Sequence, residues 1–501
     1  MKRLLAIVAT IAVAFLTQPV QADVSKMLAD AKEKASAMAI LRCTIQDELG
    51  SQTVEGPAIC IATEPSAIFT TLVLDRRLPP ESLKDFLLRP ALASDKTVKA
   101  ELLGIDPETG IGFVRAAEPY KWGLVQFASK ANLAPGQPVT SVGLMGPDTG
   151  YQPFVGMGYV SGVICVPQQL VYVTGGRLTS LGSPVFNAEG LAVGLVATQR
   201  FLAYETFISN MRGNVGLRGG PDQSRFAGFD AVLDSMSGSI GLRGQEETSY
   251  FLPVDEFAHV LVSIPASPAQ VRRLPWIGVL IFAPVPKEVV EIQKLDKPCV
   301  MADQVLPDQP AAKAGLQDRD IIVGINDQDI ERLPTPELTA ANFGNKLLRF
   351  PIGQPIKLTI HRMGETRTLE VTPAAMPSLP HEAKRYLNQS LGILVREKAV
   401  LDKFLDRSPT AAVPGLLTVL VRGDLPAGKA GLQQGDLIVN VNNQPVTTVA
   451  AFKQIVESSI AQDAQGRPAA TQGAGGPRKP ISLVIRRGDQ TQTLTIELGG
   501  P

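Results

Sequence analysis

Two stretches in the C-terminal half of the chain repeat each other, and this repeat limits the possible folds more than any other feature. Residues 310–330 read PAAKAGLQDRDIIVGINDQDI, and residues 426–446 read PAGKAGLQQGDLIVNVNNQPV. Gly315 and Asp320 recur as Gly431 and Asp436, so both pairs are offset by 116 residues (431 − 315 and 436 − 320). Matching segments flank the two copies, WIGV against SLGI upstream and LTIHRMGETRTLEV against LVIRRGDQTQTLTI downstream. Repetition at a fixed offset predicts two copies of one structural module.

Each copy contains a glycine that begins a strand suited to peptide binding. Gly278 and Gly392 permit a tight turn whose backbone N–H groups point into a small concavity that fits a carboxylate. The strands that follow, 279–282 and 393–396, are expected to offer a free edge to which a peptide can add as a further strand. Helices expected over residues 335–348 and 449–460 would shape the pocket beside these strands.

These motifs resemble the PDZ domains of the HtrA (high-temperature-requirement A) protease family. That family has an x-Φ-G-Φ loop before a strand, followed by a P-A-x-x-A-G-L-x-x-G-D-x-I segment. The resemblance implies PDZ domains over residues 270–375 and 386–499, the second with a Gly/Pro-rich flexible loop at 461–480. It assigns Gly315, Gly431, Asp320 and Asp436 to the fold. It assigns peptide binding to Ile277, Gly278, Val279, Leu391, Gly392 and Ile393.

The two copies differ next to their binding loops. The first has the bulky Trp276 before its loop, and Asp318-Arg319 stands where the second has Gln434-Gly435. We therefore expect the second module to bind C-terminal peptides that end in an apolar residue, and the first to bind more weakly or with another selectivity.

Short strands are also expected through the N-terminal half. The chain has 45 Gly and 39 Pro, which favours frequent turns. The regular spacing of apolar runs suits paired β-barrels. The runs span residues 37–42, 58–63, 68–74, 98–103, 112–115, 139–143, 155–166, 169–174 and 191–198. Before two PDZ modules, this pattern resembles the chymotrypsin-like double β-barrel of HtrA proteases. The expected fold is therefore mainly β, with the double barrel at 36–265 and a glycine-rich insertion at 200–248.

The resemblance implies that the catalytic positions of the family fall on side chains without catalytic chemistry. The segments AIFTTLVL, DPETGIGFVR and TSLGSPVFN match the family's triad segments. They place the base at Val73 (Leu72 if the register shifts by one), the orienting carboxylate at Gly110 and the nucleophile at Leu181. We therefore expect no catalytic residues and a pseudoprotease, which is not an enzyme.

Histidine content supports the same expectation, because a serine protease needs an imidazole base. The three histidines of the chain are His259, His361 and His381, so none precedes residue 259. Ser180, Ser183 and Cys165 are the nearby alternative nucleophiles. An active HtrA-type serine endopeptidase with such an unrecognised nucleophile stays open, as does a regulatory subunit of an active homologue.

The first residues read as an export signal. A basic start at Lys2 and Arg3 precedes an apolar run over 4–16, and Val20-Gln21-Ala22 fits a signal-peptidase site. Residues 1–22 are thus expected to be a signal peptide, with an uncleaved membrane anchor as the alternative. Residues 24–40 have helical spacing, and a helical segment is expected at 23–35. The expected location is the periplasm or the outside of the cell.

Charge and cysteine content exclude several classes of function. Lys+Arg and Asp+Glu both number 48, which gives no net charge to attract nucleic acid. Cys43 and Cys60 could pair in an oxidising compartment or remain buried thiols. No C-x-x-C pair exists, so we expect no metal and no cofactor. The expected partners are peptides or protein C-termini, with a homo-oligomer or an assembly with an active homologue possible. The expected function is peptide capture as a scaffold, adaptor or chaperone-like module in protein quality control.

Overall fold

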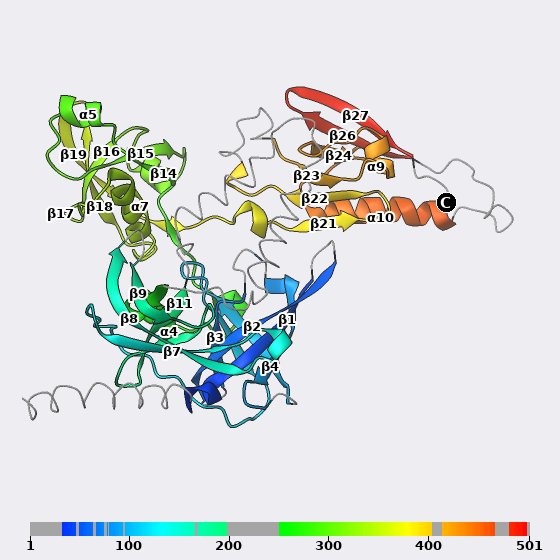
Figure 1. The fold of residues 1–501 in the computed structure, drawn as a ribbon. Coiled ribbons are helices and arrows are strands. Elements are labelled where there is room, and N and C mark those ends of the chain that lie inside the picture. Colours follow the sequence, from blue (N-terminus) through cyan, green and yellow to red (C-terminus); the bar gives the residue numbers. More distant parts are fainter. Residues whose placement is uncertain are drawn as a thin grey trace, which may run out of the picture. The chain divides into compact units, whose positions relative to one another are not determined.

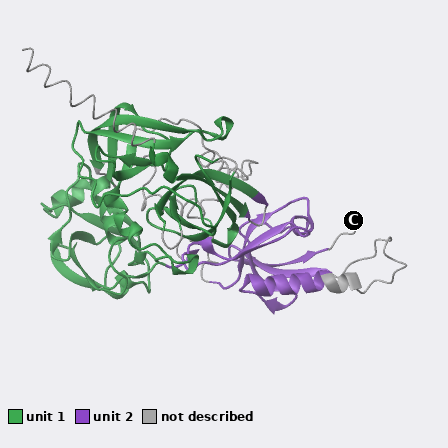
Figure 2. Cartoon of the chain, turned by 90° about the horizontal axis from the view of Figure 1, so that it is seen from below, with its two compact units in different colours: residues 1–45, 52–208, 221–376 green, residues 46–51, 209–220, 377–501 purple. Residues whose placement is uncertain are grey.

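The structure is a computed structural model that describes residues 33–46, 50–63, 67–74, 78, 80–93, 96–165, 169–197, 250–402, 413–465 and 480–497. The expected signal peptide, most of the expected N-terminal helical segment and the insertion 200–248 lie outside these residues. The chain divides into two compact units (Figure 2). One comprises residues 1–45, 52–208 and 221–376, and the other comprises residues 46–51, 209–220 and 377–501.

Two closed barrels of six strands each form the N-terminal half, as the strand pattern predicts (Figure 1). The first has the order β1-β2-β3-β6-β5-β4. Its strands are β1 (Met38–Gln46), β2 (Ser51–Ala62), β3 (Ile68–Thr71), β4 (Leu83–Pro90), β5 (Val98–Ile105) and β6 (Gly112–Ala116). The second has the order β10-β11-β12-β9-β8-β7. Its strands are β7 (Pro138–Leu144), β8 (Pro153–Cys165), β9 (Gln169–Arg177), β10 (Pro184–Phe186), β11 (Ala192–Ala197) and β12 (Tyr250–Pro253).

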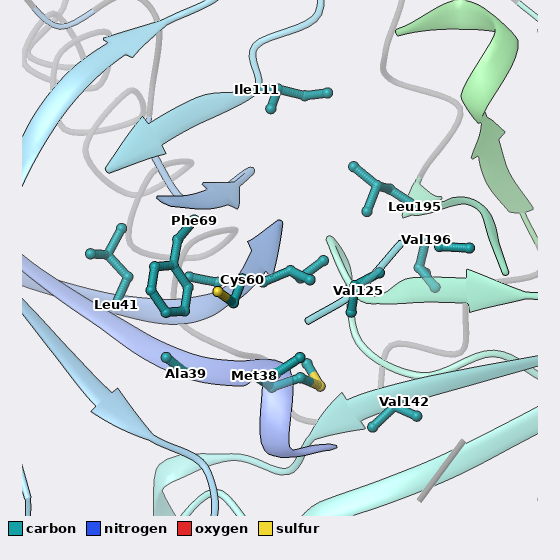
Figure 3. Packing of buried hydrophobic residues seen from close by; sticks show 14 of the residues in the cluster. Met38, Ala39, Leu41, Cys60, Phe69, Ile111, Val125, Val142, Leu195 and Val196 are labelled. Atoms are coloured by element: carbon teal, nitrogen blue, oxygen red, sulfur yellow. The ribbon is translucent and has the colours of Figure 1, made fainter. Parts of the chain in front are cut away.

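One continuous cluster of buried apolar side chains fills both barrels (Figure 3). Phe69 and Phe113 of the first barrel and Val142 and Leu195 of the second are at most 1% exposed. Alternation along the strands directs these side chains inward. The Phe69 ring packs edge-on against Trp122, with ring centroids 4.7 Å apart. The shared core holds the segments that connect the two barrels.

The first barrel begins close to where the sequence predicts its first strand. Glu33 is helical, the short 3-10 helix η1 (Lys34–Ala37) follows, and β1 begins at Met38; the rest of the predicted helical segment lies outside the described residues. Met38, Ala39 and Leu41 are fully buried there. The strands β4 and β10 were not predicted, because β4 carries three charged residues and β10 has only three residues.

The first PDZ-like module combines a sheet with a helix. The sheet has the order β14-β15-β16-β18-β19, with β17 paired to β16. Its elements are β14 (Val279–Pro284), α5 (Lys287–Ile292), β15 (Val300–Val305), α6 (Pro310–Lys313), β16 (Ile321–Ile325), β17 (Gln328–Asp329), α7 (Pro336–Leu347), β18 (Ile356–Arg362) and β19 (Glu365–Val371). The segments β13 (Pro275–Trp276) and β20 (Ala374–Ala375) pair separately.

The second module repeats this plan in the other unit. Its sheet has the order β21-β22-β23-β24-β26-β27, with β25 paired to β24. Its elements are β21 (Arg385–Asn388), β22 (Ile393–Glu397), β23 (Leu416–Val421), α9 (Pro426–Lys429), β24 (Leu437–Val441), β25 (Gln444–Pro445), α10 (Val449–Gln465), β26 (Ile481–Arg487) and β27 (Gln490–Ile496). Helices α7 and α10 stand where the sequence predicts helices. The start of the predicted loop 461–480 is wrong, because α10 continues to Gln465; residues 466–479 lie outside the described residues.

A buried aspartate fixes the same turn in both modules. In the first, the Arg362 guanidinium donates to both carboxylate oxygens of Asp320, at 2.6 and 2.5 Å, and to the Gly315 carbonyl at 2.8 Å. In the second, Arg487 makes the equivalent bonds to Asp436, at 2.7 and 2.6 Å, and to the Gly431 carbonyl at 2.8 Å. Arginine suits this role because its planar fork matches a carboxylate with two bonds at once. The residues conserved between the repeats therefore have a structural role.

Replacing Asp436 with asparagine should weaken the second module. Asp436 is 1% exposed, so the change removes a charge-assisted pair and leaves Arg487 without its carboxylate. We expect Asp436→Asn to lower the unfolding free energy by about 2 kcal/mol. Native-state hydrogen exchange of amides in β24 and β26 measures this loss. Asp489→Asn, at an exposed turn, is the control, and equal effects of the two changes would contradict the assignment.

Candidate functional site

The three predicted triad positions converge between the barrels. On the paired strands β3 and β6, Thr71 lies opposite Gly112, which brings the chain after Thr71 close to the turn before Gly112. A methyl group added at Gly182, beside Leu181, would lie 3.6 Å from Leu72 Cβ. Val73 is buried, and Gly110 has a φ of +74° in the turn that begins at Asp106. The side chains of Val73 and Leu181 and the hydrogen of Gly110 offer no group that can transfer a proton.

Two hydroxyl groups lie in the turn around Leu181. Ser180 Oγ and Ser183 Oγ are 3.0 Å apart, and Ser183 is fully buried. Backbone hydrogen bonds fix the turn, because Gly182 donates to the Val196 carbonyl at 2.8 Å and Val196 donates to the Ser183 carbonyl at 2.8 Å. The two hydroxyls therefore lie in the same hydrogen-bonded turn as Leu181, the predicted nucleophile position.

The loops around Gly278 and Gly392 have the same geometry. The Gly278 carbonyl accepts from Leu306 N–H at 2.9 Å, and the Gly392 carbonyl accepts from Arg422 N–H at 2.8 Å. Both glycines have positive φ, +87° and +71°. The neighbouring Ile277 and Leu391 side chains are buried. This match places the predicted residues at equivalent positions of both modules.

Both glycines are needed for packing as well as for the turn. A Cβ at Gly278 would lie 2.1 Å from Gln309 Cβ, and one at Gly392 would lie 2.6 Å from Leu425 Cβ. Such distances are far below van der Waals contact. Replacement of either glycine would therefore disturb the module itself, so it does not test peptide binding alone.

The strand expected to be free in the second module is not free. β22 pairs with β23 on one side and with β21 on the other, where Asn388 lies opposite Ile393 and Tyr386 opposite Val395. The prediction of an open edge over residues 393–396 is therefore wrong. The sequence did not reveal this pairing, because β21 has only four residues and lies next to the binding loop.

A cluster of charged side chains, which sequence analysis missed, surrounds Glu108. Arg272 Nη2 donates to Glu108 Oε2 at 2.5 Å, and Arg272 Nε donates to Asp106 Oδ1 at 2.6 Å. Arg349 bonds to Glu108 at 3.3 Å and to Glu256 at 2.7 Å. His259 Nε2 lies 3.3 Å from Glu108 Oε2. The partners are up to 241 residues apart, and no local motif indicates such a cluster.

These charges alter the acidity of Glu108. Burial raises the pKa of this carboxyl, but hydrogen bonds from His259 and Arg272 and the charges of Arg272 and Arg349 outweigh it. The pKa falls to about 2, so Glu108 is ionised at neutral pH. Burial has the opposite outcome for the free thiols of Cys43 and Cys60, where it raises both pKa values to about 12. These thiols are therefore poor nucleophiles.

Among the residues that the structure describes, no three side chains of His, Cys, Asp or Glu gather as a metal site. No helix within the described ranges has the length and apolar character needed to span a membrane.

Comparison with known protein families gives two matches. Residues 70–195 match the trypsin-like peptidase domain. Residues 301–338 and 421–462 match the PDZ domain. Both matches fall on the elements described above, the first on the barrels and the second on the two repeated modules.

Curated relatives share part of this architecture. The chain is 33% identical over 219 residues to a protein of Pseudomonas savastanoi pv. phaseolicola, which covers 42% of each chain. A protein of Chlamydia trachomatis is 30% identical over 195 residues, covering 38% of this chain and 36% of the relative. Both are named probable periplasmic serine endoprotease DegP-like. The chain is a homologue of the DegP/HtrA proteases. Its matches span about two fifths of the length of these relatives.

Solved structures of HtrA-type proteins are also similar. The HtrA-type protease AlgW with a tripeptide has a TM-score of 0.48 at 18% identity, covering 70% of this chain and 98% of that one. A serine endoprotease from Yersinia pestis has a TM-score of 0.43 at 13% identity, covering 69% of this chain and 97% of that one.

The HtrA relationship corrects one expectation from the sequence. We expected the chain not to be an enzyme, whereas its curated relatives are named serine endoproteases and neither match indicates a loss of catalysis. The assignment of Val73, Gly110 and Leu181 to the triad positions stays a prediction.

The low pKa of Glu108 predicts a pH-dependent contribution to stability. The folded-state pKa lies below the ordinary value of 4.5, so the contribution is present above pH 4.5 and is lost as the pH falls toward 2. Glu108→Gln should therefore lower the unfolding free energy at pH 7 by up to about 3 kcal/mol, and much less at pH 2.5. Urea denaturation at both pH values measures the difference.

The control for this measurement is Glu101→Gln. Glu101 pairs with Arg115 at 3.0 Å, but its side chain is 58% exposed. Such a pair contributes little at any pH. A loss for Glu108→Gln that is equal at pH 7 and pH 2.5 would contradict the ionic role of the cluster.

Proposed function

We propose that this HtrA-type protein binds peptide segments or protein C-termini in the bacterial cell envelope through its two PDZ modules. The observation that carries the proposal is the repeated arrangement of loop, strand and helix in both modules. An envelope location follows the names of the relatives, which are called periplasmic. Ile277, Gly278, Val279, Leu391, Gly392 and Ile393 are the proposed binding residues.

The arrangement in the first module supports this role. β14 follows directly after the Ile277-Gly278 turn and packs beside α7. The Phe282 and Phe343 rings connect the strand and the helix, with centroids 5.0 Å apart. In PDZ domains, a peptide lies between such a strand and helix, and backbone N–H groups of the turn bind its terminal carboxylate. β14 stands at one end of its sheet in the described strand order.

The test is photo-crosslinking of peptides to the full-length protein. Ten-residue peptides with an apolar last residue and a benzophenone label should attach near residues 277–279, near 391–393 or along α7 or α10. Amidation of the terminal carboxylate should reduce labelling about tenfold, because a charge-assisted hydrogen bond is lost. Mass spectrometry locates the labelled residues. Labelling confined to the barrels, or equal labelling by amidated peptides, would overturn the proposal.

A second candidate function is peptide-bond hydrolysis by the double barrel. The names of the relatives favour it, since they are called serine endoproteases. In this chain the nucleophile would be Ser180 or Ser183, whose hydroxyls lie 3.0 Å apart. Either serine would need a general base, and no histidine precedes residue 259 in the sequence.

Hydrolysis can be tested with unfolded casein and a fluorophosphonate probe, which needs an activated hydroxyl. If the barrel is catalytic, Ser180→Ala or Ser183→Ala should abolish both cleavage and labelling. Ser161→Ala, at an exposed strand position, should change neither. Absence of cleavage, or cleavage that survives both substitutions, would exclude these serines as the nucleophile.

A further inference from the structure

The strand β21 occupies the outer edge of β22 in the second module. It runs antiparallel to β22, with Arg385 opposite Arg396 and Asn388 opposite Ile393. It also lies beside α10, as Figure 1 shows. An added peptide takes this position and this direction in a PDZ domain, with its C-terminal end at the glycine turn. β21 likewise ends at the turn that contains Gly392.

Asn388 occupies the position at which the turn would bind the terminal carboxylate of a peptide. Its Oδ1 atom accepts from Leu391 N–H at 2.9 Å and from Ser390 Oγ at 2.8 Å. Its carbonyl accepts from Gly392 N–H at 2.9 Å. The Asn388 side chain is buried. Two donors of the binding turn are therefore satisfied by one amide oxygen, which resembles one oxygen of a carboxylate.

The Tyr386 side chain contacts helix α10. Its ring lies 6.2 Å from the Phe452 ring, and Lys453 Nζ lies 5.6 Å from its centroid. Its hydroxyl donates to Glu457 Oε1 at 3.0 Å and accepts from Asn388 Nδ2 at 3.2 Å. Phe452 and Lys453 are neighbours on α10 and Glu457 lies about one turn further along, so one end of this helix contacts the tyrosine that lies two residues before Asn388.

The first module does not use its own preceding segment in this way. There the segment before the turn, β13, pairs with β20. Trp276 is the residue that matches Ser390, and its indole donates to the Val279 carbonyl at 3.4 Å. Occupation by the preceding segment is therefore a property of the second copy and not of the repeated fold.

We propose that β21 is a built-in ligand of the second PDZ module, and that the same groove binds partner peptides ending in Tyr-x-x with a free terminal carboxylate. This inference rests on the proposed peptide-binding function. A four-residue turn joins β21 to β22, so the effective concentration of the internal ligand is in the millimolar range. A partner peptide must compete with it, which lowers the apparent affinity by the fraction of open grooves.

The experiment measures binding of a fluorescent peptide to the full-length protein by polarisation. The peptide has the sequence of residues 380–388, PHEAKRYLN, with a free carboxylate. Tyr386→Ala should raise its affinity at least tenfold, because β21 loses its contacts with Phe452, Lys453 and Glu457. Tyr386→Phe keeps the ring and removes only the hydroxyl, so it should raise the affinity a few fold. Replacing the tyrosine of the peptide by alanine should reverse the gain.

The matched control is Lys384→Ala, which lies next to β21 and has an exposed side chain. It should leave the affinity unchanged. Hydrogen exchange gives a second readout that needs no peptide, since the amides of Tyr386 and Asn388 should be protected in the unchanged protein and lose protection in Tyr386→Ala.

Three outcomes would overturn the inference in different ways. Unprotected β21 amides in the unchanged protein would show that the groove has no internal ligand. Equal peptide affinity in the unchanged protein and Tyr386→Ala would show that β21 does not compete, while peptide binding itself would stand. Release of β21 in Tyr386→Ala without any peptide binding would overturn the recognition of partners by this module, together with its proposed function.

Discussion

The need to pair backbone N–H and C=O groups at strand edges governs this molecule. Unpaired polar groups are costly, and an exposed edge invites other strands to bind. The barrels solve the problem by closing, so that each of their strands has two neighbours. A PDZ module cannot close, because its function needs one strand edge beside a helix. In the second module, β21 supplies the missing neighbour from the chain itself.

The same bidentate arginine–aspartate pair stabilises both modules, which explains how they share one frame although their binding turns differ. In each copy, one guanidinium joins the last strand pair to the turn that begins the central strand. None of its residues belongs to the proposed binding turns at 277–279 and 391–393. The groove can therefore differ between copies, with Trp276 in one and Asn388 in the other, without loss of the common frame.

The sequence predicted the fold better than the sites, for physical reasons. The repeat and the alternating apolar runs depend on local order, so both modules, both barrels and the helices α7 and α10 followed from them. The short strand β21 was missed because its pairing depends on a turn of four residues and not on an alternating pattern of apolar residues. The cluster at Glu108 was missed because Arg272 and Arg349 lie 164 and 241 residues away in sequence. The prediction that the chain is not an enzyme rested on Val73, Gly110 and Leu181 at the expected triad positions and on the absence of histidine before residue 259, and it was overturned by the names of its relatives.

In the proposed competition, the tether between β21 and its groove raises the peptide concentration at which half of the second modules are occupied. A competitor on the same chain is always present at the same effective concentration, whatever the amount of protein. Dilute chain ends would therefore occupy few grooves, and the occupied fraction would rise with their concentration. Short hairpins form in microseconds, so β21 would return to the groove quickly after a peptide leaves it. The four residues of β21 would thus set the peptide concentration that the second module needs for binding.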